Sequence, residues 1–342
     1  MKKINEENTS IKISPEEIQS EFYKILLKYG FKKRKALQCS EIFTQNSVDG
    51  VYTHGVNRFP KFVQYIKDGW INVNAVPSLK SSVGAIEQWD GNLGPGILNA
   101  LHATDRCMKL AQKNGIGCVA LSNTNHWMRG GFYGRKAAKK GFVFIAWTNT
   151  IANMPTWNAI DNRLGNNPLV IALPYKDDVI ALDMAMSQFS FGAMELKALK
   201  NEKLQVFGGY NKKGKLTDDP SEIIESKRPL PIGYWKGAGL ALLLDILAAV
   251  LAGGLSTYEI SRQKAECAVS QVFICIDLKK LNNYSLIAST VNNIINDYLQ
   301  SSPVNKKEKI IYPGERTSAN RKKNLQDGIP VLKSIWQEIL NL

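Results

Sequence analysis

A histidine, an amide and a guanidinium fall within five residues, at His54, Asn57 and Arg58. Histidine transfers protons in many enzymes that use no metal ion, because its ordinary pKa of about 6.5 lies close to neutral pH. Arginine binds carboxylates through two parallel hydrogen bonds. The segment 51–60 therefore predicts proton transfer beside a bound organic acid, although a histidine that only caps a helix explains the same pattern.

Pro60 limits where the next helix can begin. Because proline disrupts a helix interior, a helix through Val63 and Ile66 has to start a few residues earlier, near 55–57. This places His54 at a helix N-terminus, where unpaired amides and the positive end of the helix dipole favour an anion.

A second polar group surrounds His126, in the loop 122–131. Loops with many hydrogen-bond donors often carry binding residues, so we expect this loop to provide a second substrate contact. The remaining histidine, His102, lies among apolar residues of an expected helix; we interpret it as a helix-surface or packing residue and give it no role in the site. The loop residues that we expect at the substrate are Asn125, His126, Trp127 and Arg129.

Asp183 closes an apolar strand expected over 179–184. A carboxylate in this position binds a ribose hydroxyl, orients a catalytic group or only caps the next helix, and the sequence leaves these alternatives open. The glycine-rich turn 236–239 opens a helix, but a plain tight turn has the same composition. The sequence lacks a Rossmann GxGxxG arrangement, a P-loop, an HExxH motif and a GxSxG motif. Rossmann dinucleotide binding, nucleotide hydrolysis, zinc proteolysis and serine esterase chemistry therefore lack their usual motifs.

The chain of 342 residues carries a formal net charge of +14. A basic chain often binds nucleic acid, but these lysines are spread along the sequence without an aromatic-rich basic motif. An anionic small-molecule substrate is the preferred interpretation, and we expect no nucleic-acid partner. Nucleic-acid binding is the alternative from a different functional class.

Composition also indicates the compartment. The five cysteines are scattered and never form a CxxC pair, which predicts reduced thiols and no metal site. Polar residues occupy the N-terminus where a secretory signal would be apolar. The longest apolar run, 239–255, contains Asp245 and predicts a buried helix instead of a membrane span. We therefore expect a cytoplasmic protein without a membrane partner.

Short apolar runs alternate with helical patterns through the middle of the chain, while both ends read as helical. Strands are expected at 83–88, 116–121, 142–147 and 269–278, and a strand pair at 169–173 and 179–184. A closing helix is expected over 331–340, and residues 1–13 are expected to be frayed. This pattern predicts an α/β core with a helical cap made from the two termini.

Six motifs in this order resemble the malate/L-lactate dehydrogenase-type family of NAD(P)-dependent oxidoreductases, which is unrelated to the Rossmann-fold lactate and malate enzymes. The resemblance covers residues 14–342. The motifs are Thr53-His54-Gly55-Val-Asn-Arg58, Asn125-His126, Gly165-Asn-Asn-Pro168, Asp183-Met-Ala-Met-Ser187, Lys236-Gly237-Ala-Gly239-Leu and Pro313-Gly314-Glu315-Arg316 with Arg321.

The resemblance implies a non-Rossmann fold in which a mixed sheet binds the cofactor. Residues 81–282 would form this NAD(P)-binding domain, and residues 1–80 with 283–342 would form a helical domain. It also implies a homodimer. NADH is the expected cofactor, and NADPH remains open because no residue that selects between the two riboses can be placed.

The resemblance also assigns site residues. His54 would be the proton donor. Beside it, we expect Arg58 to bind the substrate carboxylate, Asn125 and His126 to hold its hydroxyls or carbonyl, and Trp127 and Arg129 to select a sugar-acid chain. The cofactor would contact Val179, Ile180, Ala181, Leu182, Asp183, Met184, Ala185, Trp235, Lys236, Gly314, Glu315 and Arg316. Two positions depart from the family pattern: Thr53 stands where serine is usual, and Arg316 follows Glu315 where related reductases carry a histidine-glutamate pair.

Longer stretches are similar to the 2,3-diketo-L-gulonate reductases within this family. The expected activity is therefore reduction of the carbonyl of a small anionic 2-oxo sugar acid by NAD(P)H. Dehydrogenases of the same family for malate, sulfolactate, ureidoglycolate or a cyclic imine acid are the alternatives. The stretches are Tyr52 to Pro60, Gly84 to Asp90, Asn125 to Gly131 and Gly233 to Gly237.

Overall fold

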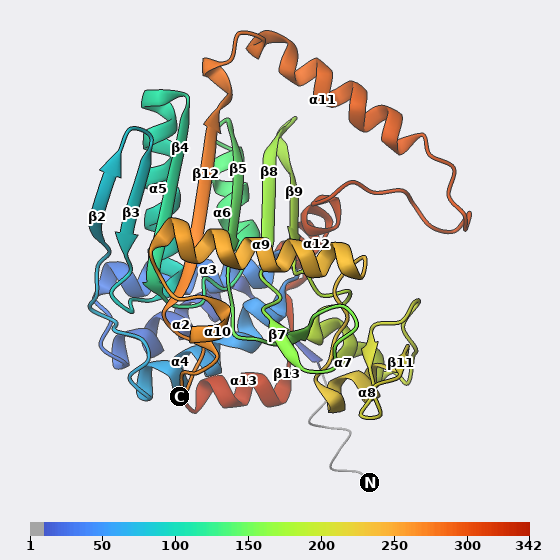
Figure 1. The fold of residues 1–342 in the computed structure, drawn as a ribbon. Helices are drawn as coiled ribbons and strands as arrows, with labels where there is room; N and C mark the ends of the chain where they lie inside the picture. Colours follow the sequence, from blue (N-terminus) through green and yellow to red (C-terminus); the bar gives the residue numbers. More distant parts are fainter. Residues whose placement is uncertain (1–9) are drawn as a thin grey trace.

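The computed structural model describes residues 10–342, and its centre is a seven-stranded sheet (Figure 1). Within these residues, β3 and β4 pair in parallel, and all other neighbours in the sheet pair antiparallel. The sheet is therefore mixed, as predicted. In spatial order its strands are β2 (Ser78–Val83), β3 (Ile86–Asp90), β4 (Ile116–Thr124), β12 (Val269–Asp277), β5 (Phe142–Thr148), β8 (Leu169–Tyr175) and β9 (Asp178–Met184).

Helices cover both faces of this sheet. The helices α5 (Gly96–Asn114) and α6 (Gly130–Ala138) pack on one face, and α9 (Trp235–Ala252) crosses the other (Figure 1). Because β12 lies between two layers, seven of its nine residues are buried, and its sequence contains the continuous apolar run 272–276.

A helical layer from the two ends of the chain lies below the sheet in Figure 1. Its core includes Phe22, stacked on Phe59 with 3.9 Å between ring centroids. The division into two domains that we predicted stays a prediction, since α11 (Tyr284–Leu299) contributes no buried residue to this core. The helices of the layer are α2 (Pro15–Lys28), α3 (Lys33–Val48), α4 (Phe59–Lys67) and α13 (Lys333–Leu340). The helix α12 (Glu315–Asp327) contacts α3 but, like α11, contributes no residue to this core.

The two ends also meet in a small sheet that was not predicted. The strand β1 (Ser10–Ile13) pairs antiparallel with β13 (Ile329–Leu332). The expectation of a frayed segment was wrong for residues 10–13, and residues 1–9 lie outside the described residues. Ile13, Ile329 and Val331 enter the helical core, so long-range burial stabilises two strands too short to recognise from local pattern.

A small unit between β9 and α9 lies at the lower right of Figure 1. It packs around Met194, Leu204 and Ile223. The unit contains α7 (Phe191–Leu199), β10 (Gly209–Tyr210), β11 (Leu216–Thr217) and α8 (Pro220–Ser226). The remaining short elements, elsewhere in the chain, are β6 (Met154–Pro155), β7 (Asn162–Leu164), α10 (Thr257–Ile260) and the 3-10 turns η1 (Tyr52–His54), η2 (Val56–Arg58) and η3 (Leu278–Lys280).

Two sequence predictions about elements were wrong. The single strand expected at 83–88 is a hairpin, because Gly84 adopts φ +57° and turns the chain between β2 and β3. The helix α9 was expected to be buried, but only one side of it lies on the sheet, through Ala241, Leu244 and Ala248. The other side exposes Trp235, Leu240, Leu242, Leu243, Ile246, Leu247 and Val250.

In the described part of the chain, α9 is also the one helix long and apolar enough to cross a membrane. Its alanine-rich face packs against the central strands, as a core helix of a globular protein does. Packing against the sheet therefore explains the apolar residues on that side of α9.

Candidate active site

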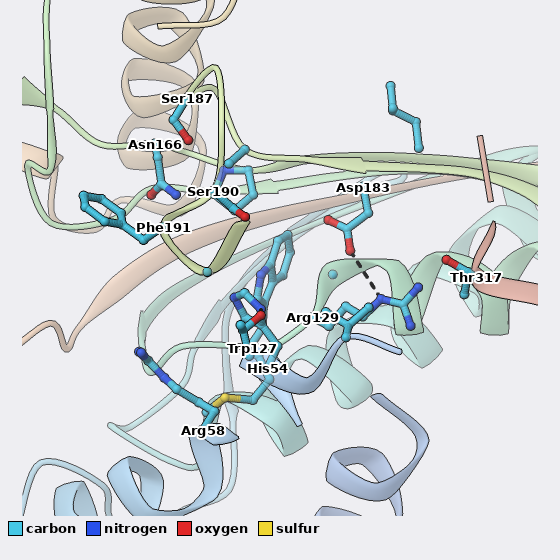
Figure 2. A pocket seen from close by; sticks show the side chains of 18 of the residues that line it. His54, Arg58, Trp127, Arg129, Asn166, Asp183, Ser187, Ser190, Phe191 and Thr317 are labelled. Atoms are coloured by element: carbon cyan, nitrogen blue, oxygen red, sulfur yellow. Dashed lines mark hydrogen bonds and ion pairs between the residues drawn. The ribbon is translucent and has the colours of Figure 1, made fainter. Parts of the chain in front are cut away.

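A cleft of about 940 Å³ runs between the segment 51–61, the loop 126–130, strand β9 and the segment 311–317. Figure 2 shows its interior, with His54 and Arg58 on one side and Asp183 on the opposite strand. The cleft brings together these residues predicted from the sequence: His54, Arg58, His126, Trp127, Arg129, Ala181, Leu182, Asp183, Ala185, Gly314 and Arg316.

The backbone around His54 differs from the predicted helix start. His54 ends the turn η1, η2 follows, and α4 begins only at Phe59, with Pro60 in its first turn. Between the two turns, Gly55 presses against α3, where an added Cβ would lie 2.2 Å from the Ser47 Oγ. Packing on α3 therefore fixes His54, and the helix-dipole argument does not apply to it.

His54 has one ring nitrogen engaged and one available. Its Nδ1 lies 3.1 Å from the Thr53 Oγ1, a hydroxyl that can donate or accept, so Nε2 is left for a ligand. Burial lowers the pKa of His54 to about 4; Asp183 opposes this shift, while the cations Arg58 and Arg129 add to it. The ordinary histidine pKa assumed from the sequence does not hold in the free cleft.

His126 stacks beside His54, with 5.7 Å between ring centroids and 18° between ring planes. Its Nδ1 accepts the backbone N–H of Met128 at 3.0 Å. A neutral imidazole that accepts at Nδ1 carries its hydrogen at Nε2, so His126 is a hydrogen-bond donor. Burial lowers the pKa of His126 well below its ordinary value, and nearby Arg58 adds to the shift, which keeps this ring neutral.

Arg58 and Lys61 make the end of the cleft near the histidines electropositive. The Nη2 of Arg58 lies 4.0 Å from a carboxylate oxygen of Glu266. Burial lowers the pKa of Lys61; Arg58 adds to the shift and Glu266 opposes it. Two cations close to two imidazoles suit an anionic substrate.

Arg129 lies at the floor of the cleft and is only 6% exposed. Its guanidinium pairs with Asp49, and its Nε lies 3.7 Å from Asp183 (Figure 2). Asp183 also accepts the backbone N–H of Gly131 at 2.8 Å. The charge of Arg129 is therefore shared between two carboxylates of the protein before any ligand binds.

Asn125 and Trp127 have structural contacts of their own. The Asn125 amide donates to the carbonyl oxygens of Trp70, Leu93 and Gly94, and this residue does not line the large cleft. Trp127 lines the cleft but is buried in the core between the sheet and its helices. Substrate contact by either residue stays a prediction.

The other end of the cleft is lined by β9 and the segment 311–317. Here the segment 311–317 runs along β9, with the Ala181 N–H donating to the Pro313 carbonyl at 3.0 Å. Gly314, at φ +99°, comes so close to β9 that an added Cβ would lie 3.1 Å from the Ala181 nitrogen. Small residues and exposed backbone here fit a flat, extended cofactor.

Six predicted cofactor residues do not line the cleft: Val179, Ile180, Met184, Trp235, Lys236 and Glu315. Val179 is buried in the core, and Trp235 begins α9 with 65% of its surface exposed. The Glu315 carboxylate accepts the Tyr312 N–H at 3.3 Å and so stabilises the turn that leads into α12. Their contact with the cofactor stays a prediction.

The cleft also contains residues to which sequence reasoning gave no role. Asn166 and Ser187 lie inside two of the motifs that carried the resemblance, so a signal for them existed. The others come from separated segments, and no local pattern marked them. They include Lys61, Thr150, Asn153, Phe191, Glu195, Glu266 and Tyr312.

Two histidines and an arginine share one cleft beside a mixed sheet, an arrangement that fits a dehydrogenase of hydroxy acids. The chain belongs to the malate/L-lactate dehydrogenase family, which matches residues 13–340. It is therefore an NAD(P)-dependent oxidoreductase that acts on CH–OH donors.

The 2,3-diketo-L-gulonate reductases of Klebsiella pneumoniae and Citrobacter koseri are each 40% identical over 330 residues, 96% of this chain and 99% of theirs. The structure of sulfolactate dehydrogenase from Methanocaldococcus jannaschii is 27% identical, with a TM-score of 0.89 over 97% of this chain and 98% of that one. Malate dehydrogenase from Entamoeba histolytica is 23% identical with a TM-score of 0.90, over 98% and 99% of the two chains, and shares the fold.

Proposed function

We propose that the protein reduces the 2-oxo group of 2,3-diketo-L-gulonate, or of a closely similar sugar acid, with NADH. The observation that carries the proposal is the stacked pair His54 and His126 beside Arg58 in one cleft. The curated relatives at 40% identity support the choice of substrate. Malate, sulfolactate, ureidoglycolate and cyclic imine acids are the alternatives within the family.

In this proposal Arg58 binds the substrate carboxylate, and the His126 Nε2–H donates to the oxygen of the reacting carbonyl. A nicotinamide cofactor held beside β9 and the segment 311–317 would supply the hydride. His54 then gives its Nε2 proton to the oxygen, which becomes the hydroxyl of the 2-hydroxy acid. In the reverse direction the neutral ring accepts that proton.

The low pKa of His54 in the free protein is compatible with this role. Arg58 is one of the cations that lower it, and a substrate carboxylate paired with Arg58 offsets that positive charge. Asp183 favours the imidazolium from the other side. Binding of the anionic substrate therefore raises the pKa of His54 when a proton donor is needed.

We also propose a cytoplasmic homodimer. The exposed apolar side of α9 supports the dimer, together with Tyr284, Leu286, Ile294 and Leu299 on α11, which projects beyond the sheet in Figure 1. Large contiguous apolar faces commonly mark subunit interfaces. In this arrangement, residues 81–282 form the cofactor domain, and residues 1–80 with 283–342 form the helical domain.

The test is a steady-state assay of NADH and NADPH oxidation with 2,3-diketo-L-gulonate, oxaloacetate, sulfopyruvate and piperideine-2-carboxylate. We expect 2,3-diketo-L-gulonate to give the highest kcat/KM and NADH to be preferred. His54→Ala lowers kcat by about 10²-fold or more, the usual contribution of general acid catalysis. A faster alternative acid would overturn the substrate, and an unchanged kcat in His54→Ala would overturn the proton donor.

A further inference from the structure

Glu266 places a carboxylate in the part of the cleft that binds the acid. It lies in the loop between α10 and β12, its side chain is only 15% exposed, and it lines the same cavity as His54 and Arg58. A negative charge beside Arg58 weakens binding of the substrate carboxylate, so Glu266 needs a separate explanation.

The hydrogen bonds of Glu266 leave most of its acceptors available. One oxygen accepts the Ile151 N–H at 3.3 Å, and the other is 4.0 Å from the Arg58 Nη2, outside hydrogen-bond distance. An ionised carboxylate offers about four acceptor sites and no donor. It therefore suits a ligand that brings hydroxyl hydrogens.

The amide and hydroxyl groups nearby are already bonded within the protein. The Thr150 hydroxyl donates to the Asn166 side-chain oxygen at 3.1 Å, and the Asn153 amide donates to the same oxygen at 2.9 Å. Glu266 therefore offers free acceptor sites at a point of the cleft where the neighbouring amide and hydroxyl groups are already bonded.

We propose that Glu266 selects the substrate by accepting hydrogen bonds from hydroxyl groups on the chain beyond the 2-oxo acid, and by repelling acids that carry a second carboxylate or a sulfonate there. The protein would thus take singly charged, hydroxylated 2-oxo acids. This rests on the proposed reduction of a 2-oxo acid and adds the residue that sets its specificity.

The variant Glu266→Gln tests the selection. The amide keeps one acceptor oxygen for the Ile151 N–H, loses the charge, and gains N–H donors that a second carboxylate can use. We compare kcat/KM for 2,3-diketo-L-gulonate, which has hydroxyls, oxaloacetate, which has a second carboxylate, and 2-oxobutyrate, which has an alkyl tail.

Relative to 2-oxobutyrate, we expect the variant to lose about tenfold for 2,3-diketo-L-gulonate and to gain about tenfold for oxaloacetate. The conservative variant Glu266→Asp keeps the charge, so it should keep the preference against oxaloacetate. Equal losses for all three acids would mean that Glu266 only positions Arg58, and this would overturn the proposal.

Glu195→Gln is the matched comparison, because it removes the same charge from the α7 side of the cleft. Equal shifts in both variants would assign the selectivity to net charge and not to Glu266. Turnover by the wild type with unchanged ratios in Glu266→Gln would contradict this inference alone. No turnover of any acid by the wild type would contradict the proposed function and the inference together.

Discussion

The Arg129 Nε lies 3.7 Å from the carboxylate of Asp183, and the same guanidinium pairs with Asp49 at the end of α3. Asp49 is only 3% exposed and also accepts from Arg321 of α12 at 2.6 Å. These four charges connect the helical layer to the strand that lines the cleft. The network therefore connects β9 to the C-terminal end of α3, just before the segment that carries His54.

Removing the guanidinium from this network should be costly. In Arg129→Met, Asp183 loses its cationic partner and buried Asp49 keeps only Arg321, so we expect the free energy of unfolding to fall by about 3–5 kcal/mol, as for other broken buried pairs. Urea unfolding measures this. Arg163→Met, which breaks an exposed pair with Asp161, should leave the midpoint unchanged, and an equally small effect at Arg129 would contradict the prediction.

The titration of His54 can be followed directly, because the chain has only three histidines. We expect its ring resonances in the free protein to titrate near pH 4, because burial and the two arginines disfavour the imidazolium. Arg58→Gln removes one of these cations and should raise the pKa. A His54 pKa of about 6.5 in the wild type would show that the cleft is more hydrated than its geometry implies.

The same pKa determines opposite pH dependences for the two directions of the reaction. Reduction needs the imidazolium, so kcat/KM for the oxo acid should fall as the pH rises above the pKa of free His54. Oxidation needs the neutral ring, so kcat/KM for the hydroxy acid should stay high at neutral pH and fall only below about pH 4. Profiles with the same slope in both directions would contradict His54 as the group responsible.

Thr53 and Gly192 form a close contact between η1 and α7. A Cβ at position 192 would lie 2.6 Å from the Thr53 Cγ2, whereas the next nearest atom, the Thr53 Cβ, is 3.7 Å away. We therefore expect Gly192→Ala to displace the turn that holds His54 and to lower kcat/KM for the proposed substrate by about tenfold, because small misplacements at a reacting group are costly.

A second substitution, at Thr53, should restore the activity of Gly192→Ala. Thr53→Ser removes the Cγ2 methyl and keeps the hydroxyl beside the His54 Nδ1, so the double variant should recover most of the activity. Thr53→Ser alone should be close to the wild type. If the double variant is as impaired as Gly192→Ala, the contact is not the cause of the loss.

Local pattern identified most of the sheet. The apolar runs that became β4, β5, β12 and the hairpin β8–β9 are visible because buried strands need continuous apolar residues. The strands β1 and β13 were missed since each has only four residues and is stabilised by its distant partner. The placement of His54 was wrong in detail because packing of Gly55 on α3 decided it, and that contact has no signature in segment 51–60.

Site residues could be predicted only where residues of suitable chemistry are neighbours in the sequence. His54 and Arg58 are neighbours in sequence, and the cleft does contain both. Glu266 approaches Arg58 from a loop more than two hundred residues away, so no spacing rule connects them. Donor density in the loop also predicted a ligand contact for Asn125; its amide bonds three backbone carbonyls, and the ligand contact stays a prediction.

The exposed side of α9 gives the last prediction, on assembly. Leu243, Leu247 and Val250 recur at helical spacing on that side, and Leu243 is 56% exposed in the single chain. If two chains bury this face, Leu243→Lys places a charge in an apolar interface and should dissociate the dimer. Light scattering after gel filtration should give twice the chain mass of 38.1 kDa for the wild type and one chain mass for the variant.

Leu37→Lys is the control, because Leu37 is about as exposed but lies on α3 in the helical layer. It should remain a dimer, which separates a specific loss of the α9 contact from a general effect of an added lysine. A wild type that is monomeric at micromolar concentration, or a Leu243→Lys variant that stays dimeric, would mean that α9 is covered by something other than a second copy of the chain.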